Sequence, residues 1–353
     1  MERPVKVLQF GEGNFLRAFV DYMIDIANEQ GKFNGDIVLV KPIEFGSLDR
    51  FHDQECQYTV QLRGIVDGEP KRINRIVTSV ADAVDAYGEY QKYADYAKLD
   101  SLRYIVSNTT EAGIVYDDTD RLEMEPPKSY PGKLTKFLYE RYKHFNGAMD
   151  KGLVMLPVEL IDDNGIHLKE CVEKLAVLWN LEDGFKTWLD EACVFTSTLV
   201  DRIVTGYPRD EAEELCKEFG YQDNLIVTGE PFALWVIESA KDISKEFPLP
   251  DAGLPVIFTD NQKPYKQRKV RILNGAHTSF VLASYLCGND IVLESMQDEL
   301  IFNFMKATIF DEVIPTLTLP KQDLIDFAEA VITRFNNPYV KHALLSISLN
   351  SVS

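Results

Sequence analysis

A glycine turn near the N-terminus constrains the fold of this chain more than any other feature. An apolar run at residues 5–10 leads into the turn Gly-Glu-Gly-Asn at residues 11–14, and apolar residues then recur at helical spacing over residues 15–30. A second apolar run follows at residues 36–40. The segment therefore predicts strand, turn, helix and strand, which is the β-α-β unit of a parallel sheet.

Further along the chain, strands and helices continue to alternate. Apolar runs at residues 104–106 and 153–158 predict two more strands, and residues 133–145 predict a helix between them. Alternating residues on both sides of Asp67-Gly68 predict a β-hairpin over residues 57–79. The fold class is therefore α/β, a Rossmann-type, mostly parallel doubly wound sheet with an inserted hairpin.

The pattern changes after about residue 264, where apolar spacing predicts helices over residues 266–287, 296–309 and 324–335. A chain of 353 residues also exceeds the size at which one hydrophobic core stops growing. We therefore expect a dinucleotide-binding domain at residues 1–262 and a mainly α-helical substrate or catalytic domain at residues 263–353. The chain stops shortly after an apolar run, so the helical domain is expected to lack its C-terminal part.

Charge and cysteine content narrow the functional class. With 37 Lys and Arg against 56 Asp and Glu, the net charge of −19 disfavours nucleic acid and anionic membrane surfaces as partners. The five cysteines are far apart in sequence and never form C-x-x-C, which indicates reduced thiols and a cytoplasmic location. No apolar stretch approaches the roughly 18 residues of a membrane span.

The glycine turn itself is a candidate phosphate-binding site. Gly11 and Gly13 would place backbone amides where a dinucleotide pyrophosphate can lie against a helix N-terminus. The third glycine of G-x-G-x-x-G is replaced by Leu16, so a tight turn that binds nothing is the alternative. Lys41 ends the second strand, where an acidic residue usually holds the adenosine ribose; it is compatible with NAD, with NADP or with a solvated lysine.

Residues 268–278 contain the richest group of candidate catalytic side chains in the chain. On an α-helix at about 100° per residue, Asn274 lies about 140° and His277 about 80° from Lys269, so the three share one half of the helix. A lysine, an amide and an imidazole there are the parts of a proton-transfer site. The alternative is a salt-bridged lysine, a capping asparagine and a core histidine.

Other segments are less specific. Asp201 and Arg202 lie at a strand end, where such a pair either orients a catalytic group or forms a structural ion pair, and Asn164 lies in a cluster typical of a helix N-cap. The sequence contains no H-E-x-x-H, G-x-S-x-G or G-x-x-x-x-G-K-[ST], and its five histidines are scattered. A metal site is therefore not expected.

Taken together, these motifs resemble the long-chain polyol dehydrogenase family, which contains mannitol dehydrogenase. The resemblance rests on GEGNF with Arg17, on T-E-x-G from residue 110, on VDRI from residue 200, and on Lys269-x4-Asn274-x2-His277. Within the family, QFGEGNFLRAF, SNTTEAGI, PVELIDDNG and KVRILNGAHT look most like the branch that reduces keto-hexuronates. Leu16 stands where polyol and fructuronate members usually carry histidine.

The resemblance implies a metal-independent, nicotinamide-dependent reductase with NAD as cofactor and NADP left open. It implies Lys269 as general acid/base, Asn274 and Asn164 as oxyanion donors, His277 as a substrate-positioning group and Asp201 as a supporting carboxylate. The implied cofactor contacts come from the glycine turn and the two strand ends beside it: Gly11, Gly13, Asn14, Phe15, Lys41, Asn108, Thr110 and Glu111.

The implied reaction is reduction of D-tagaturonate by NADH to D-altronate in hexuronate catabolism. The expected partner is a small sugar acid, and the expected assembly is a monomer or weak homo-oligomer. Fructuronate reductase and mannitol or arabinitol dehydrogenase are the alternatives within the family. An inactive dinucleotide-binding sensor is the alternative from another class.

Overall fold

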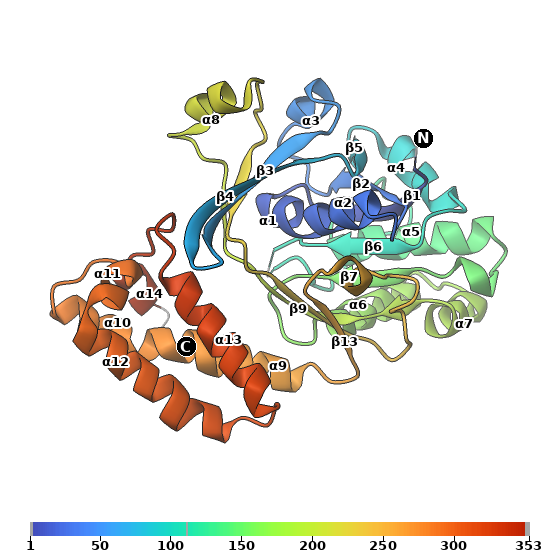
Figure 1. Ribbon diagram of the computed structural model, residues 1–353. Coiled ribbons are helices and arrows are strands. Elements are labelled where there is room, and N and C mark those ends of the chain that lie inside the picture. The colour runs from blue at the N-terminus through green and yellow to red at the C-terminus, as the bar shows by residue number, and fades with distance from the viewer. Residues whose placement is uncertain (1–2, 111, 350–353) are drawn as a thin grey trace. The chain divides into compact units, whose positions relative to one another are not determined.

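A computed structural model describes residues 3–110 and 112–349 of the chain (Figure 1). It divides into two compact units, each built from three segments of sequence. Unit 1 comprises residues 1–60, 75–228 and 233–260, and unit 2 comprises residues 61–74, 229–232 and 261–353. The domain boundary expected from sequence, between residues 262 and 263, stays a prediction.

Unit 1 is built on a six-stranded sheet with the order β5-β2-β1-β6-β7-β8. Each described neighbouring pair in this sheet is parallel. The strands are β1 (Val5–Phe10), β2 (Asp36–Lys41), β5 (Val80–Asp85), β6 (Tyr104–Ser107), β7 (Val154–Pro157) and β8 (Val194–Phe195). Counted within this sheet, the order is 3-2-1-4-5-6, the doubly wound dinucleotide-binding topology, so the predicted fold class is confirmed.

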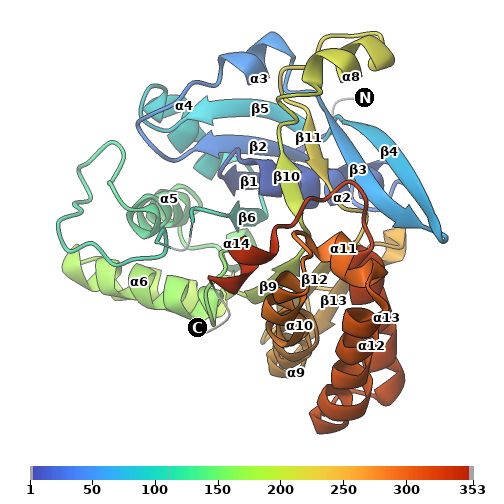
Figure 2. The same cartoon turned by 90° about the vertical axis from the view of Figure 1, so that its left-hand side faces the viewer.

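Side chains alternate between the two faces of this sheet and bury both of them. Leu8 and Phe10 of β1 belong to the apolar core shared with the helices on one face. These helices are α4 (Tyr90–Asp95), α5 (Tyr130–His144), α6 (Asn164–Leu178) and α7 (Asp183–Glu191). Figure 2 shows α5 and α6 on one side of β1 and α2 (Tyr22–Glu29) on the other.

The second face is closed by an aromatic cluster. Phe19 packs on Trp235 with ring centroids 5.5 Å apart, and Tyr104 of β6 packs on Phe247 at 5.0 Å. Trp235 lies in a three-stranded sheet, β13-β12-β9. Its strands are β9 (Ser197–Asp201), β12 (Leu234–Glu238) and β13 (Val256–Thr259). The central sheet is therefore covered on both faces, as its near-continuous apolar strands require.

The predicted hairpin forms as β3 (Tyr58–Val66) and β4 (Glu69–Val77). Asp67 and Gly68 join the strands with φ angles of 55° and 80°, the left-handed conformation that a two-residue turn of this type needs. The hairpin lies in a four-stranded sheet, β10-β11-β3-β4, with β10 at Val204–Gly206 and β11 at Val227–Gly229. Two further helices of unit 1 are α3 (Asp49–Asp53) and α8 (Ala212–Phe219).

Unit 2 is mainly helical, as the sequence predicts. Its helices are α9 (Lys263–Arg268), α10 (Gly275–Leu286), α11 (Val292–Gln297), α12 (Glu299–Ala307), α13 (Lys321–Phe335) and α14 (Leu344–Ser348). A buried ion pair fixes α13 to segment 229–232, since Arg334 donates to both Glu230 oxygens at 3.0 and 2.8 Å. The Arg334 guanidinium also lies 4.3 Å from the ring centroid of Phe232.

A buried carboxylate in unit 1 makes stability depend on pH. Asp21 is fully buried, accepts a hydrogen bond of 2.6 Å from the Tyr58 hydroxyl, and burial raises its pKa to about 7. Because an unfolded aspartate has a pKa near 3.9, the folded state binds the extra proton, and this contribution to stability is lost as the pH rises from about 4 to 7.

We therefore expect Asp21→Asn to flatten the pH dependence of the free energy of unfolding. Between pH 5 and pH 8 the wild type should lose about 3 kcal/mol more of its free energy of unfolding than the variant, measured by denaturant titration. Asp53→Asn, at an exposed aspartate, is the control. Equal pH dependence in the wild type and Asp21→Asn would contradict the burial argument.

Candidate active site

The turn after β1 brings three backbone segments of unit 1 close together. Gly11 adopts a φ of 120°, and its N–H donates to the carbonyl of Val40 at 3.0 Å. A Cβ at Gly11 would lie 3.0 Å from the Asn108 carbonyl oxygen and 3.2 Å from Leu16 Cδ1. A side chain therefore has no place there, whereas Gly13 has nothing within 4 Å of its would-be Cβ and faces open space.

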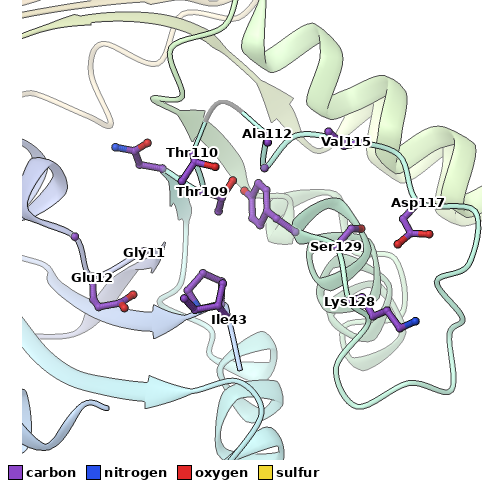
Figure 3. Close-up of a pocket in the computed structure, with 15 residues that line it drawn as sticks. Gly11, Glu12, Ile43, Thr109, Thr110, Ala112, Val115, Asp117, Lys128 and Ser129 are labelled. Carbon is purple, nitrogen blue, oxygen red and sulfur yellow. The ribbon is translucent and has the colours of Figure 1, made fainter. Parts of the chain in front are cut away.

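A cavity of about 420 Å³ opens beside this turn (Figure 3). It lies at the carboxyl ends of β1, β2 and β6, where the strand order reverses direction and where ligands bind in sheets of this kind. The lining comes from the glycine turn, the two neighbouring strand ends and the start of α5: Gly11, Glu12, Gly13, Pro42, Ile43, Asn108, Thr109, Thr110, Ala112, Gly113, Val115, Asp117, Lys128, Ser129 and Tyr130.

Four of the predicted cofactor contacts meet at this cavity, namely Gly11, Gly13, Asn108 and Thr110. Asn14 and Phe15 begin α1 (Asn14–Leu16) beside it: the Asn14 side-chain oxygen accepts from Arg17 at 2.7 Å, and Phe15 stacks on Phe19 at 5.0 Å. Glu111, also predicted as a contact, lies outside the described residues. Close backbone approach, amide donors and an apolar wall fit a dinucleotide.

The cavity wall after β6 is held by a residue that sequence reasoning missed. Glu159 is buried and accepts hydrogen bonds from Thr109 N–H at 3.0 Å, Thr109 Oγ1 at 2.9 Å and Ser107 Oγ at 3.1 Å. These donors partly offset the burial that raises the pKa of its carboxyl. The sequence feature that could have predicted this role is an acidic residue close after a buried strand.

Lys41 lies at the end of β2 as predicted, but its amine is engaged inside unit 1. Its side chain is 1% exposed, and Nζ donates to the carbonyls of Ile43, Glu44 and Phe45 at 2.8, 3.2 and 3.3 Å. Nζ also pairs with Asp85 at 3.1 Å. The structure thus gives Lys41 the role of shaping the loop that carries Pro42 and Ile43, while direct contact with a cofactor stays a prediction.

Asn164 and Asp201 belong to unit 1 and are buried. The Asn164 amide nitrogen lies 3.0–3.1 Å from the carbonyl oxygens of Pro157, Glu159 and Thr198, and its side-chain oxygen accepts from the N–H groups of Gly165 and Thr198. Both amide hydrogens therefore have internal acceptors. A role as oxyanion donor stays a prediction that requires one of these bonds to be exchanged.

Lys269, Asn274 and His277 lie on one continuous helix of unit 2, but its geometry differs from the expected one. Residues Lys269–Asn274 form a π-helical turn between α9 and α10, in which the N–H of Gly275 bonds to the carbonyl of Val270. The α-helical angle of about 140° between Lys269 and Asn274 is therefore wrong. In the i→i+5 register of a π-turn, two residues five apart come closer to the same face, and such turns recur at functional sites.

His277 is enclosed by aromatic rings, including one that sequence reasoning did not connect to it. Its ring centroid lies 4.5 Å from Phe335 and 5.4 Å from His342 at 82°, an edge-to-face contact. Burial, with His342 and Arg334 nearby, lowers the pKa of His277 to about 3, so the imidazole is neutral at physiological pH. No sequence motif links positions 277 and 342.

Residues 3–110 and 112–349 contain neither a metal-binding cluster nor a helix suited to crossing a membrane. Within those ranges, no cluster of three or more His, Cys, Asp or Glu side chains is arranged to hold a metal ion. No helix there is both long enough and apolar enough to cross a lipid bilayer.

The strand order and the cavity at its switch point define unit 1 as a Rossmann-type dinucleotide-binding unit, and the helical unit 2 carries a lysine, an amide and an imidazole on one helix. Two family models match the chain in the same order. The mannitol dehydrogenase Rossmann domain matches residues 5–250, and the mannitol dehydrogenase C-terminal domain matches residues 261–353. The chain belongs to the mannitol dehydrogenase family and is an oxidoreductase acting on CH–OH groups.

Curated relatives are similar over nearly the whole chain. It is 46% identical over 351 residues to the altronate oxidoreductase of Bacteroides thetaiotaomicron, covering 99% of this chain and 73% of that protein. It is 48% identical over 353 residues to the altronate oxidoreductase of Pectobacterium atrosepticum, covering 100% and 72%.

Solved structures share the fold. Mannitol 2-dehydrogenase of Pseudomonas fluorescens, in a ternary complex with NAD and D-mannitol, superposes with a TM-score of 0.76 at 24% identity, covering 98% of this chain and 71% of that one. Substrate-free D-sorbitol dehydrogenase superposes with a TM-score of 0.83 at 23% identity, covering 98% and 72%. At these identities the likeness supports the fold alone.

The position of Lys41 predicts how its loss would act. Lys41→Met removes the donor that holds the carbonyls of residues 43–45, so NADH should bind about tenfold more weakly and NADPH at least as much more weakly. Fluorescence titration of both nucleotides measures this. Lys92→Met is the matched control, because Lys92 also pairs with an aspartate of β5, Asp82, at 2.8 Å. A loss confined to NADPH would instead indicate a direct contact with its 2′-phosphate.

Proposed function

We propose that this chain reduces the ketone of a keto-hexuronate with a nicotinamide dinucleotide, converting D-tagaturonate to D-altronate with NADH. The observation that carries the proposal is 45–48% identity, over nearly the entire chain, to curated altronate oxidoreductases. In this proposal, the cavity of unit 1 would bind the dinucleotide. Lys269 on the helix of unit 2 would exchange the proton that the reaction needs.

The cofactor proposal rests on the cavity beside the glycine turn. Gly11 and Gly13 would admit a pyrophosphate to the backbone, and Asn108 and Thr110 would contact it from the loop after β6. When bound, the nicotinamide ring supplies the hydride that the carbonyl carbon accepts. We propose NAD(H) over NADP(H), since the Lys41 amine is engaged by three carbonyls and Asp85.

The proton and the developing charge are assigned to unit 2. Lys269 would hand a proton from Nζ to the carbonyl oxygen and would accept one in the reverse direction. The Asn274 amide would donate to the same oxygen while negative charge develops there, an effect that can be worth roughly 3–4 kcal/mol per donor. His277, neutral at working pH, would orient the substrate hydroxyl or the lysine.

Location and assembly are part of the proposal. All five cysteines are free thiols in the structure, which is typical of a reducing compartment and supports a cytoplasmic enzyme. We propose a monomer or weak homo-oligomer that acts on a small sugar acid.

A substrate panel tests the proposed reaction. Purified protein is mixed with NADH or NADPH and with tagaturonate, fructuronate or fructose, and nicotinamide oxidation is followed by absorbance. Turnover with tagaturonate and NADH is expected. Preference for fructuronate or for fructose would instead make the chain a fructuronate reductase or a polyol dehydrogenase, and silence with every pair would favour a dinucleotide-binding sensor.

The assignment of Lys269 makes a separate prediction. Lys269→Ala should lower kcat at least about 100-fold and leave NADH affinity unchanged, because the general acid is lost while the cavity of unit 1 is intact. Lys263→Ala, at an exposed lysine that starts the same helix, should keep wild-type turnover. Near-normal turnover of Lys269→Ala would remove the lysine from the mechanism.

A further inference from the structure

The end of β2 lacks the acidic group that sheets of this type normally present there. In dinucleotide-binding folds that group accepts a hydrogen bond from the 2′-hydroxyl of the adenosine ribose. Here β2 ends in Lys41, a cation that cannot accept a hydrogen bond and whose amine is engaged by the carbonyls of residues 43–45. The loop after β2 carries a carboxylate at Glu44, but this residue is exposed and absent from the described cavity lining, so the ribose side of the cavity needs its acceptor from another element.

The neighbouring strand does not provide that acceptor. Asp85 ends β5, but its carboxylate pairs with Lys41 at 3.1 Å and accepts from the N–H of Tyr87 at 3.0 Å. These bonds, with that of Gly88, hold the pKa of Asp85 below its usual range in spite of partial burial. Asp85 is thus part of the structure that fixes the loop after β2, and it is absent from the described cavity lining.

Glu12 contributes a carboxylate to the lining of the cavity beside the glycine turn. Two of the described lining residues carry carboxylates, Glu12 and Asp117. Figure 3 shows Glu12 next to Gly11 with its carboxylate directed toward Ile43 of the loop after β2, and Asp117 on the opposite side of the cavity beside Lys128. Glu12 is therefore the carboxylate that borders both the glycine turn and the end of β2.

The charge of Glu12 is only partly balanced by its surroundings. Burial raises the pKa of its carboxyl, and the negative charge of Asp85 adds to this effect. A backbone hydrogen bond and the cations Lys41 and Arg17 act against it. Lys41 is already paired with Asp85, and the Arg17 guanidinium donates to the backbone carbonyls of Glu12 and Leu225 and to the Asn14 side chain. A second anion placed next to Glu12 would meet repulsion in a partly buried site.

We propose that Glu12, from the glycine turn, is the residue that selects NAD(H) against NADP(H) in this chain. Its carboxylate accepts the hydrogen bond of the ribose 2′-hydroxyl and repels a phosphate at the same position, so one group supplies both the attraction and the exclusion. This inference rests on the proposed function in requiring that the cavity binds a nicotinamide dinucleotide, and it is independent of the sugar that is reduced.

The test is a binding measurement without sugar substrate. NADH and NADPH are each titrated into wild type, Glu12→Gln, Glu12→Lys and the control Asp53→Asn, an exposed aspartate outside the described cavity lining, with nicotinamide fluorescence as the readout. Thermal melting confirms that each variant is folded. The wild type should bind NADH about 100-fold more tightly than NADPH, since like charges in close contact cost several kcal/mol.

Glu12→Gln should reduce the preference for NADH over NADPH at least about tenfold, chiefly through tighter NADPH binding. Glu12→Lys should shift the preference further toward NADPH. Asp53→Asn should leave the ratio at its wild-type value. An unchanged ratio in both Glu12 variants would overturn the assignment. If the wild type binds neither nucleotide, the assignment of Glu12 and the proposed function both fail. If the Glu12 variants shift the NADH-to-NADPH affinity ratio but the protein turns over no ketone, the assignment of Glu12 is supported and the proposed reaction alone is contradicted.

Discussion

The candidate cofactor site of unit 1 depends on one close approach of backbone to backbone. Gly11 turns the chain out of the central strand with a φ of 120°, bonds to the end of β2, and leaves 3.0 Å between its would-be Cβ and the Asn108 carbonyl. A β-carbon would strain this conformation and press on the loop after β6. The three strand ends that form the cavity can therefore meet only because this position is glycine.

Buried charged residues then fix the two loops that flank the turn. Lys41 holds the loop after β2 through three carbonyls and one aspartate, and Glu159 holds the loop after β6 through three donors. Buried charges are tolerated where each is paired and hydrogen-bonded, and removing one partner costs more than the pair contributes. Both residues lie behind the cavity wall, so they shape the site through the backbone.

The sequence was sufficient for the central fold and for part of the site. Apolar runs predicted β1, β2, β6 and β7 because buried parallel strands are nearly continuous in hydrophobicity. β5 was missed, because this edge strand carries aspartates at positions 82 and 85 within its alternation.

The roles of Lys41 and Asn164 could not be predicted from the sequence. Spacing places a residue at a strand end, and only tertiary contacts decide whether its polar atoms face a ligand or the protein. The π-turn at Lys269–Asn274 escaped prediction for a related reason, since the apolar pattern of one turn does not distinguish i→i+4 from i→i+5 bonding.

The central claim is that a hydride passes from a nicotinamide dinucleotide to the ketone carbon of a keto-hexuronate on this chain. The most direct measurement incubates the protein with tagaturonate and NADH deuterated at the transferable position, and locates the label in the product by NMR. The account predicts altronate with deuterium on the former ketone carbon, and label transfer at least about 100-fold slower with Lys269→Ala at matched NADH saturation. Product without deuterium on that carbon, or label transferred to fructose and not to tagaturonate, would contradict it.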